Sequence, residues 1–104
     1  LPIIISENGL GAYDVLTEAG EVNDDYRIDF LRKHILACEA AMSHGVNLLA
    51  YCTWSFTDLL SWLNGYKKRY GFVHIDFDSE ALKRTKKKSY YWYQNVIATN
   101  GEEL

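Results

Sequence analysis

The stretch I-I-I-S-E-N-G at residues 3–9 constrains the fold more than any other part of the sequence. A run of β-branched apolar residues is typical of a buried strand, and this one leads directly into Glu7 and an Asn-Gly turn signal. Glu7 is therefore expected at the C-terminal end of a strand. Because active sites of parallel α/β proteins form at that end, Glu7 is a catalytic candidate. The alternative is a solvated glutamate that precedes a turn.

A long helix is predicted after a loop. Residues 10–22 mix glycines with polar residues and show no sustained period, which predicts the loop. Asn23 or Asp24 is suited to the N-cap of the helix, and Gly45 to the left-handed position after its C-terminus. The helix is predicted over residues 24–44. Its core-facing stripe, at steps of three and four residues, consists of Ile28, Leu31, Ile35, Cys38 and Met42.

Residues 46–54, V-N-L-L-A-Y-C-T-W, predict a second and mostly apolar strand. Strand, helix and strand form one βαβ unit, whose strands must be parallel and whose crossover is expected to be right-handed. Parallel strands this apolar require cover on both faces, and two strands alone leave the sheet with unpaired edges. Residues 1–104 are therefore expected to be an incomplete part of a single larger α/β domain, without an internal boundary.

Residues 55–70 lack periodicity but are rich in aromatic, polar and basic side chains. A long loop of this kind after a strand is usually functional or disordered, and its aromatic content argues against disorder. Residues 71–76 predict a short strand, and residues 87–99 predict a last helix with packed aromatic side chains. The basic run at residues 83–88 is interpreted as a solvated face leading into that helix, in preference to a nucleic-acid patch.

The composition excludes several classes of function. With 48% hydrophobic residues the 104-residue chain is globular, and its net charge of -3 gives no general attraction for nucleic acid or a membrane surface. No apolar stretch is long enough to span a membrane. Cys38 and Cys52 have no metal-ligand spacing and are expected to be buried reduced thiols. No metal site is expected from His34, His44 and His74, which lack ligand spacing.

Three motifs carry a resemblance to a known family. They are I-S-E-N-G at residues 5–9, N-D-D-Y-R-I-D-F-L-R-K-H-I at residues 23–35, and W-S-F-T-D-L-L-S-W-L-N-G-Y-K-K-R-Y-G-F-V-H-I-D at residues 54–76. In combination they resemble the C-terminal quarter of glycoside hydrolase family 1, the retaining β-glycosidases, over essentially the whole chain. The resemblance implies that the chain supplies the seventh and eighth strands, with their helices, of a (β/α)8 TIM barrel.

The resemblance implies that Glu7 is the catalytic nucleophile. Retaining glycosidases use two carboxylates about 5–5.5 Å apart, one as nucleophile and one as general acid/base. In the family the acid/base glutamate lies in an N-E-P motif, which this sequence does not contain. The 104-residue chain alone is therefore expected to be inactive. Trp54 resembles the family's tryptophan that lies against the sugar ring, and no cofactor is implied.

The loop after Trp54 departs from the pattern of enzymes that act on plain sugars. Where those enzymes carry a glutamate that binds sugar hydroxyls, this sequence has Ser61, followed by Lys68 and Tyr70. The pattern S-x-x-x-x-x-x-K-x-Y is similar to that of the 6-phospho-β-glycosidases, whose three corresponding residues hold the 6-phosphate. Without the resemblance, Lys67, Lys68 and Arg69 would be interpreted as a solvated basic run.

The implied activity is hydrolysis of 6-phospho-β-glucosides or 6-phospho-β-galactosides. Trp62 keeps the bulky ring that phospho-β-galactosidases and plain glucosidases carry there, which implies a galacto or dual preference. Phosphorylated sugars do not cross membranes unaided, so a cytoplasmic enzyme linked to a sugar phosphotransferase import system is expected. Two alternatives stay open: a β-glucosidase for unphosphorylated sugars, and a non-catalytic sugar-phosphate-binding or structural protein. No oligomeric state is indicated.

Overall fold

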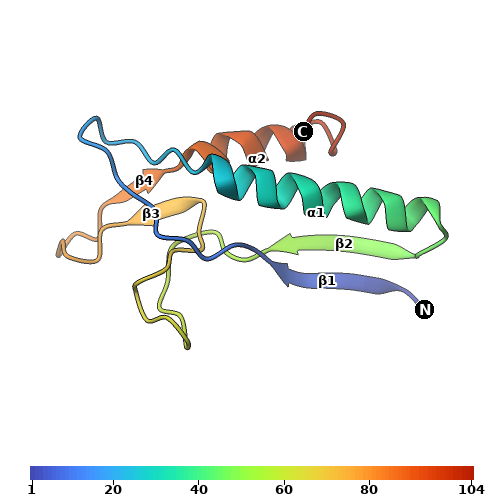
Figure 1. Ribbon diagram of the computed structural model, residues 1–104, viewed down its shortest axis with the longest axis horizontal. Coiled ribbons are helices and arrows are strands. Elements are labelled where there is room, and N and C mark those ends of the chain that lie inside the picture. Colours follow the sequence, from blue (N-terminus) through green and yellow to red (C-terminus); the bar gives the residue numbers. More distant parts are fainter.

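A computed structural model describes residues 1–104, and Figure 1 shows two long helices lying along one side of a two-stranded sheet. A second small sheet lies beyond the C-terminal end of the first. The elements in chain order are β1 (Ile3–Asn8), α1 (Asp25–Ser43), β2 (Leu48–Thr53), β3 (Val73–Ile75), β4 (Arg84–Lys86) and α2 (Lys88–Ala98).

The predicted βαβ unit is present. Strands β1 and β2 pair in parallel, with Ile5 opposite Tyr51, and α1 connects them. The helix ends where the sequence predicts, since His44 is its C-cap and Gly45 follows with φ +96°. Its N-cap is Asp24, but the Asp24 side chain does not cap the helix. That carboxylate instead accepts hydrogen bonds from other parts of the chain.

The predicted strand and helix faces are less covered than their patterns indicate. Ile28 and Leu31 of α1 are buried as expected, but Met42 at the other end of the stripe is 47% exposed. Ile3 and Ile4 of β1 are also exposed, contrary to the expectation of a buried strand. The reason is visible in Figure 1, because both helices lie on the same side of β1 and β2 and nothing covers the other side.

The interpretation of the basic run as a solvated face that leads into a helix is confirmed except at Lys87. Residues 84–86 form β4, which pairs antiparallel with β3 through Val73–Lys86, His74–Thr85 and Ile75–Arg84. Lys87, which follows, has a relative exposure of 0% and is among the most deeply buried residues. Helix α2 then begins at Lys88, one residue from the predicted start. The basic run therefore includes strand β4, the buried Lys87 and the first residue of α2. Its other basic side chains face solvent.

Both cysteines are free thiols. Cys38 on α1 is half-buried, and burial raises the pKa of its thiol. Cys52 on β2 is exposed, which corrects the expectation that both thiols are buried. The correction has the same cause as the exposure of β1, since the helices cover only one face of the sheet.

Candidate active site

The ends of β1 and β2 meet at one edge of the sheet. Asn8 pairs with Thr53, its carbonyl accepts a 2.7 Å hydrogen bond from the Trp54 amide, and its side-chain oxygen accepts one of 2.7 Å from the Tyr51 hydroxyl. Gly9 lies against this junction so closely that a Cβ there would be 1.6 Å from the Trp54 carbonyl oxygen. Only glycine allows the two strand ends to approach in this way.

This junction places Glu7 and Trp54 on neighbouring strand ends, as the sequence predicts. The Glu7 side chain is exposed, and the Trp54 ring is partly exposed at 44%. Neither side chain is buried by packing within the chain. The carboxylate and the aromatic face are therefore both available to a ligand at this edge.

The loop of residues 61–70 forms a tight turn that brings two of its predicted site residues together. Ser61 and Gly65 exchange backbone hydrogen bonds of 2.8 and 2.9 Å, and Gly65 has φ +60°. The Ser61 Oγ lies 3.4 Å from the Tyr70 hydroxyl. Trp62, at the tip of the turn, is fully exposed and touches little of this chain.

Lys68 is held differently. Its Nζ lies 5.8 Å from the centroid of the Tyr13 ring, within cation–π range. It forms no ion pair, whereas Lys33, Lys87 and Lys88 each pair with an aspartate. Lys68 and its more exposed neighbour Lys67 are thus both cations of this loop without an acidic partner, and only Lys68 lies near the Tyr13 ring. No hydrogen bond joins Lys68 to Ser61 or Tyr70.

The loop is docked against the strand ends through backbone contacts. Ala12 and Arg69 form an antiparallel bridge with hydrogen bonds of 3.0 and 2.7 Å, and the Ser55 amide donates to the Tyr70 carbonyl at 3.0 Å. A Cβ on Gly11 would lie 2.6 Å from the Tyr70 ring, so the chain passes directly over that ring. These contacts bring the predicted phosphate-binding residues toward the edge that carries Glu7 and Trp54.

Beneath the loop lies a buried charge network that the sequence did not reveal. At its centre the Lys87 Nζ donates to Asp14 and Asp58, each at 2.6 Å, with all three side chains fully buried. Asp58 also accepts hydrogen bonds from the Arg69 guanidinium at 2.7 Å and from the Gly71 amide at 3.1 Å. One carboxylate thereby ties the loop to the small sheet.

The network extends to α1 and α2 through Arg27. Its guanidinium donates to Asp14 at 2.9 Å, to Asp24 at 2.6 Å and to the Arg69 carbonyl at 2.8 Å. Asp24 in turn accepts a 2.9 Å hydrogen bond from the Ser89 amide at the start of α2. Three carboxylates face three cations, so the buried charges are balanced. The charge network consists of Asp14, Asp24, Arg27, Asp58, Arg69 and Lys87.

Two pKa shifts follow from this environment. Burial acts to raise the pKa of Asp14, but hydrogen bonds from Arg27 and Lys87 outweigh it and leave the pKa below its ordinary value. His74 in β3 is buried, and burial together with the nearby Arg69 cation lowers its pKa. Asp14 is therefore held as a carboxylate and His74 as a neutral imidazole. Both are structural supports and lie outside the exposed edge.

Part of this network has a sequence signal. Asp58 and Arg69 lie in the motifs W-S-x-x-D and R-Y-G that carry the family resemblance. Asp14 and Lys87 are 73 residues apart and have no local pattern that would pair them. The fold alone brings them together.

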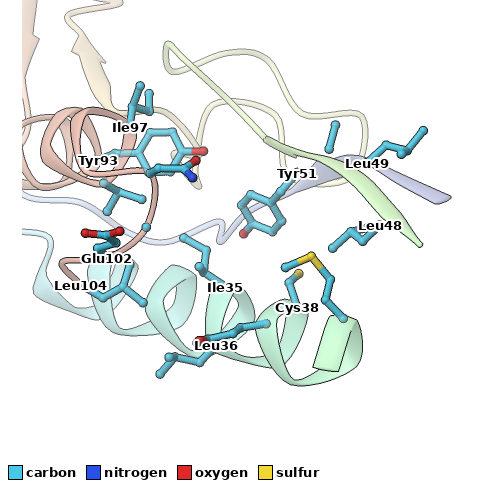
Figure 2. A pocket seen from close by; sticks show the side chains of 16 residues that line it. Ile35, Leu36, Cys38, Leu48, Leu49, Tyr51, Tyr93, Ile97, Glu102 and Leu104 are labelled. Carbon is cyan, nitrogen blue, oxygen red and sulfur yellow. The ribbon is translucent and has the colours of Figure 1, made fainter. Parts of the chain in front are cut away.

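An apolar cavity lies apart from the candidate site. It measures about 720 Å³ and lies between α1, β2 and α2, where Figure 2 shows Ile35, Tyr51 and Tyr93 lining it from three elements. Of its sixteen lining residues twelve are hydrophobic, and the charged ones, Glu39 and Glu102, are both acidic. An anionic ligand has no cation to bind there. The cavity belongs to the layer between the helices and the sheet.

No three histidine, cysteine or acidic side chains lie close enough together to hold a metal ion. None of the helices combines the length and apolar character needed to span a membrane.

Comparison with known proteins decides the family. The sequence profile of glycosyl hydrolase family 1 matches residues 1–102. The chain belongs to this family. The resemblance inferred from the three motifs is thereby confirmed.

Curated relatives and solved structures agree with this assignment. An aryl-phospho-β-D-glucosidase of Bacillus subtilis (strain 168) is 64% identical over 107 residues, a match that covers 100% of this chain and 22% of the relative. A 6-phospho-β-galactosidase of Streptococcus equi subsp. zooepidemicus (strain H70) is 46% identical, covering 93% of this chain and 20% of that relative. A family 1 β-glucosidase from Thermotoga maritima matches with a TM-score of 0.92 at 43% identity, covering 99% of this chain and 23% of the other.

The chain thus spans less than a quarter of the length of these relatives. The solved relatives are TIM-barrel glucosidases, and a segment of such a barrel agrees with both the TM-score and the open sheet seen here. The chain therefore has the fold of a segment of a (β/α)8 barrel.

Proposed function

We propose that this chain is the C-terminal segment of a retaining 6-phospho-β-glycosidase, with β1 and β2 as the seventh and eighth strands of its barrel. The observation that carries the proposal is the 61–70 loop, in which the hydroxyls of Ser61 and Tyr70 lie 3.4 Å apart and Lys68 has no acidic partner. Two hydroxyls and a free cation are a set of donors suited to an anion. Names of relatives such as aryl-phospho-β-D-glucosidase support the same substrate class.

In the proposed reaction Glu7 attacks the anomeric carbon of the sugar to form a covalent glycosyl-enzyme. A second carboxylate protonates the leaving oxygen and then activates water, and the two groups lie about 5–5.5 Å apart in retaining enzymes. We place this general acid/base outside the 104 residues, because they contain no N-E-P motif. Trp54 supports the sugar ring from the neighbouring strand end.

Charge explains why Ser61 favours a phosphorylated sugar. At about 4 Å and an effective dielectric near 20, two unit charges interact by roughly 4 kcal/mol. A glutamate at position 61 would repel a phosphate by that amount, whereas Ser61 is neutral and donates a hydrogen bond. Lys68 adds an attraction of the same order before desolvation. An enzyme for unphosphorylated sugars would gain nothing from this arrangement.

The proposed enzyme acts in the cytoplasm on sugars that are phosphorylated during import. The physical reason is that a charged phosphosugar does not diffuse through a lipid bilayer. The partner implied by the chemistry is therefore a phosphotransferase import system that supplies the substrate. Neither nucleic acid nor a membrane surface is expected to bind.

The proposal is tested by Lys68→Ala in the full-length enzyme that carries this segment. The neighbouring exposed Lys67→Ala is the matched control, since it removes the same charge from the same loop. Lys68→Ala should lower kcat/KM for a 4-nitrophenyl 6-phospho-β-glycoside by at least about tenfold, because a charge-assisted hydrogen bond is lost. The same variant should leave the unphosphorylated glycoside nearly unchanged, and Lys67→Ala should change neither.

Two results would contradict the proposal. Equal losses on both glycosides would show that Lys68 does not bind phosphate. A wild-type enzyme that prefers the unphosphorylated glycoside would favour the alternative of a plain β-glucosidase.

A further inference from the structure

The hydrogen bonds around Ser61 fix the direction in which its hydroxyl donates. A serine hydroxyl has one proton and two acceptor positions. The backbone amides of Leu63 and Asn64 both donate to the Ser61 Oγ at 3.3 Å. Because both acceptor positions are engaged, the remaining capacity of this hydroxyl is to donate its proton.

The direction in which the Tyr70 hydroxyl donates is likewise fixed by a hydrogen bond, in this case from a side chain. The Asn64 Nδ2 donates to the Tyr70 hydroxyl oxygen at 2.7 Å, which is short and therefore strong for this type of contact. The Ser61 Oγ is 3.4 Å away, near the limit of a hydrogen bond. The Tyr70 oxygen already accepts from Asn64, and both acceptor positions of Ser61 are engaged by the amides of Leu63 and Asn64. The Tyr70 proton is therefore directed to a third group.

We propose that Asn64 is a positioning residue that presets Tyr70 as a donor to the substrate's phosphate. The inference rests on the proposed function and adds a fourth residue to Ser61, Lys68 and Tyr70. An amide is suited to this task because its NH2 group donates without carrying a charge. A carboxylate at the same position would take the Tyr70 proton for itself and repel the phosphate.

The backbone and side chain of Asn64 have separable roles, which makes the inference testable. The backbone amide of Asn64 bonds to the Ser61 Oγ and is retained in any substitution other than proline. The side chain reaches only Tyr70 by hydrogen bond. A substitution of the Asn64 side chain therefore removes the hydrogen bond that orients the Tyr70 hydroxyl and leaves the backbone hydrogen bonds of the turn in place.

The experiment compares three variants of the full-length enzyme, Asn64→Ala, Asn64→Asp and Tyr70→Phe, together with the double variant Asn64→Ala/Tyr70→Phe. The readout is kcat/KM for 4-nitrophenyl 6-phospho-β-D-glucoside and for 4-nitrophenyl β-D-glucoside. Asn64→Ala should lower the value for the phosphorylated substrate about tenfold, and Asn64→Asp more than about a hundredfold because of charge repulsion. The value for the plain glucoside should stay within about twofold.

The double variant decides whether Asn64 acts through Tyr70. If it does, Asn64→Ala should have little further effect once the Tyr70 hydroxyl is gone, so that the two losses are not additive. Equal losses on both glucosides, or the same loss from Asn64→Ala in the Tyr70→Phe background, would overturn the inference and assign Asn64 a merely structural role. The wild-type preference for the phosphorylated substrate would then persist. A wild type without that preference would overturn the proposed function, and this inference with it.

Discussion

Lys87 in the charge network and Lys68 in the 61–70 loop are the same residue type under opposite conditions. Lys87 is fully buried and bonded to Asp14 and Asp58, each at 2.6 Å. Lys68 is partly exposed, has no acidic partner and rests near the Tyr13 ring. The first lysine is paired within the chain, and the second has its charge available.

This difference separates support from recognition. A buried ion must be paired and hydrogen-bonded because its desolvation is expensive. Each charge of the network accordingly has an oppositely charged neighbour, although the Arg27 Nε has no hydrogen-bond partner. A group that binds a ligand must keep part of its bonding capacity free. On this criterion we propose Glu7, Lys68 and the hydroxyls of Ser61 and Tyr70 as the recognition groups. Changes to the network should therefore alter stability, and changes to the recognition groups should alter activity.

The largest effect is expected from Glu7→Gln in the full-length enzyme. Removing the proposed nucleophile should lower turnover of an aryl 6-phospho-β-glycoside by about ten-thousandfold or more, since cooperating catalytic groups are not replaceable one by one. The amide is isosteric and Glu7 is exposed, so the thermal midpoint and substrate binding should change little. Turnover is measured by release of the aryl group, and binding by competition.

A chemical label sharpens the same prediction. A 2-fluoro glycoside forms a long-lived adduct with the nucleophile of a retaining enzyme, and mass spectrometry of digested protein should find it on Glu7. An adduct on another carboxylate would reassign the nucleophile. It would also remove Glu7 from the recognition groups.

The second prediction concerns the charge network. Lys87→Met should destabilise the enzyme by about 3–5 kcal/mol, because it leaves Asp14 and Asp58 buried with less compensation. Lys86→Met is the matched control, since the neighbouring Lys86 is exposed and forms no ion pair, and its Nζ lies 4.9 Å from the centroid of the Tyr90 ring. The control should change stability by less than about 1 kcal/mol. Denaturant unfolding of the two variants measures the difference.

Equal stability of the two variants would break the comparison between buried and exposed lysines. Loss of activity in Lys87→Met without loss of stability would also contradict it. In that case the network would act on the substrate directly.

The elements that sequence reasoning predicted well are those with local signals. Helix α1 has an apolar period and Gly45 at its end, and the strand before Glu7 is a run of β-branched residues. Both signals lie within a few residues of the structure they specify. The placement of Glu7 and Trp54 on neighbouring strands follows from parallel pairing alone.

The elements that it missed depend on distant contacts. Residues 83–88 look like a solvated basic run, and only tertiary structure buries Lys87 between Asp14 and Asp58. The hydrogen bond from Asn64 to Tyr70 likewise depends on the turn between them. The exposure of Ile3 is a different case. The apolar run of β1 indicates a face that packs against other residues, and these 104 residues do not cover that face.

A smaller effect is expected from pH. Burial acts to raise the pKa of Asp14, but hydrogen bonds from Arg27 and Lys87 lower it below the value of the unfolded chain, which is about 4. A depressed pKa contributes stability above the unfolded value, and that contribution is lost as pH falls through the folded value. The thermal midpoint should therefore decrease as the pH is lowered below about 4. Asp14→Asn should reduce this pH dependence, whereas the exposed Asp78→Asn should not.

An unchanged acid dependence in Asp14→Asn would show that other carboxylates account for it. The charge network would then contribute to stability independently of pH in this range. The comparison between the network and the recognition groups would lose its electrostatic basis.

The smallest effect is expected on the relative kcat/KM for the two sugar epimers, for which Trp62 is the candidate determinant. Its ring is fully exposed at the tip of the 61–70 loop and is therefore accessible to a substrate. A bulky ring at this position implies a galacto or dual preference. The value of kcat/KM for the 6-phospho-glucoside should therefore exceed that for the 6-phospho-galactoside by no more than about a hundredfold. Trp62→Ala should shift the ratio toward the glucoside, and Leu63→Ala, beside it and equally exposed, should not. A wild-type glucoside preference above about a hundredfold, or roughly 2.7 kcal/mol, would show that the ring at position 62 does not set the epimer.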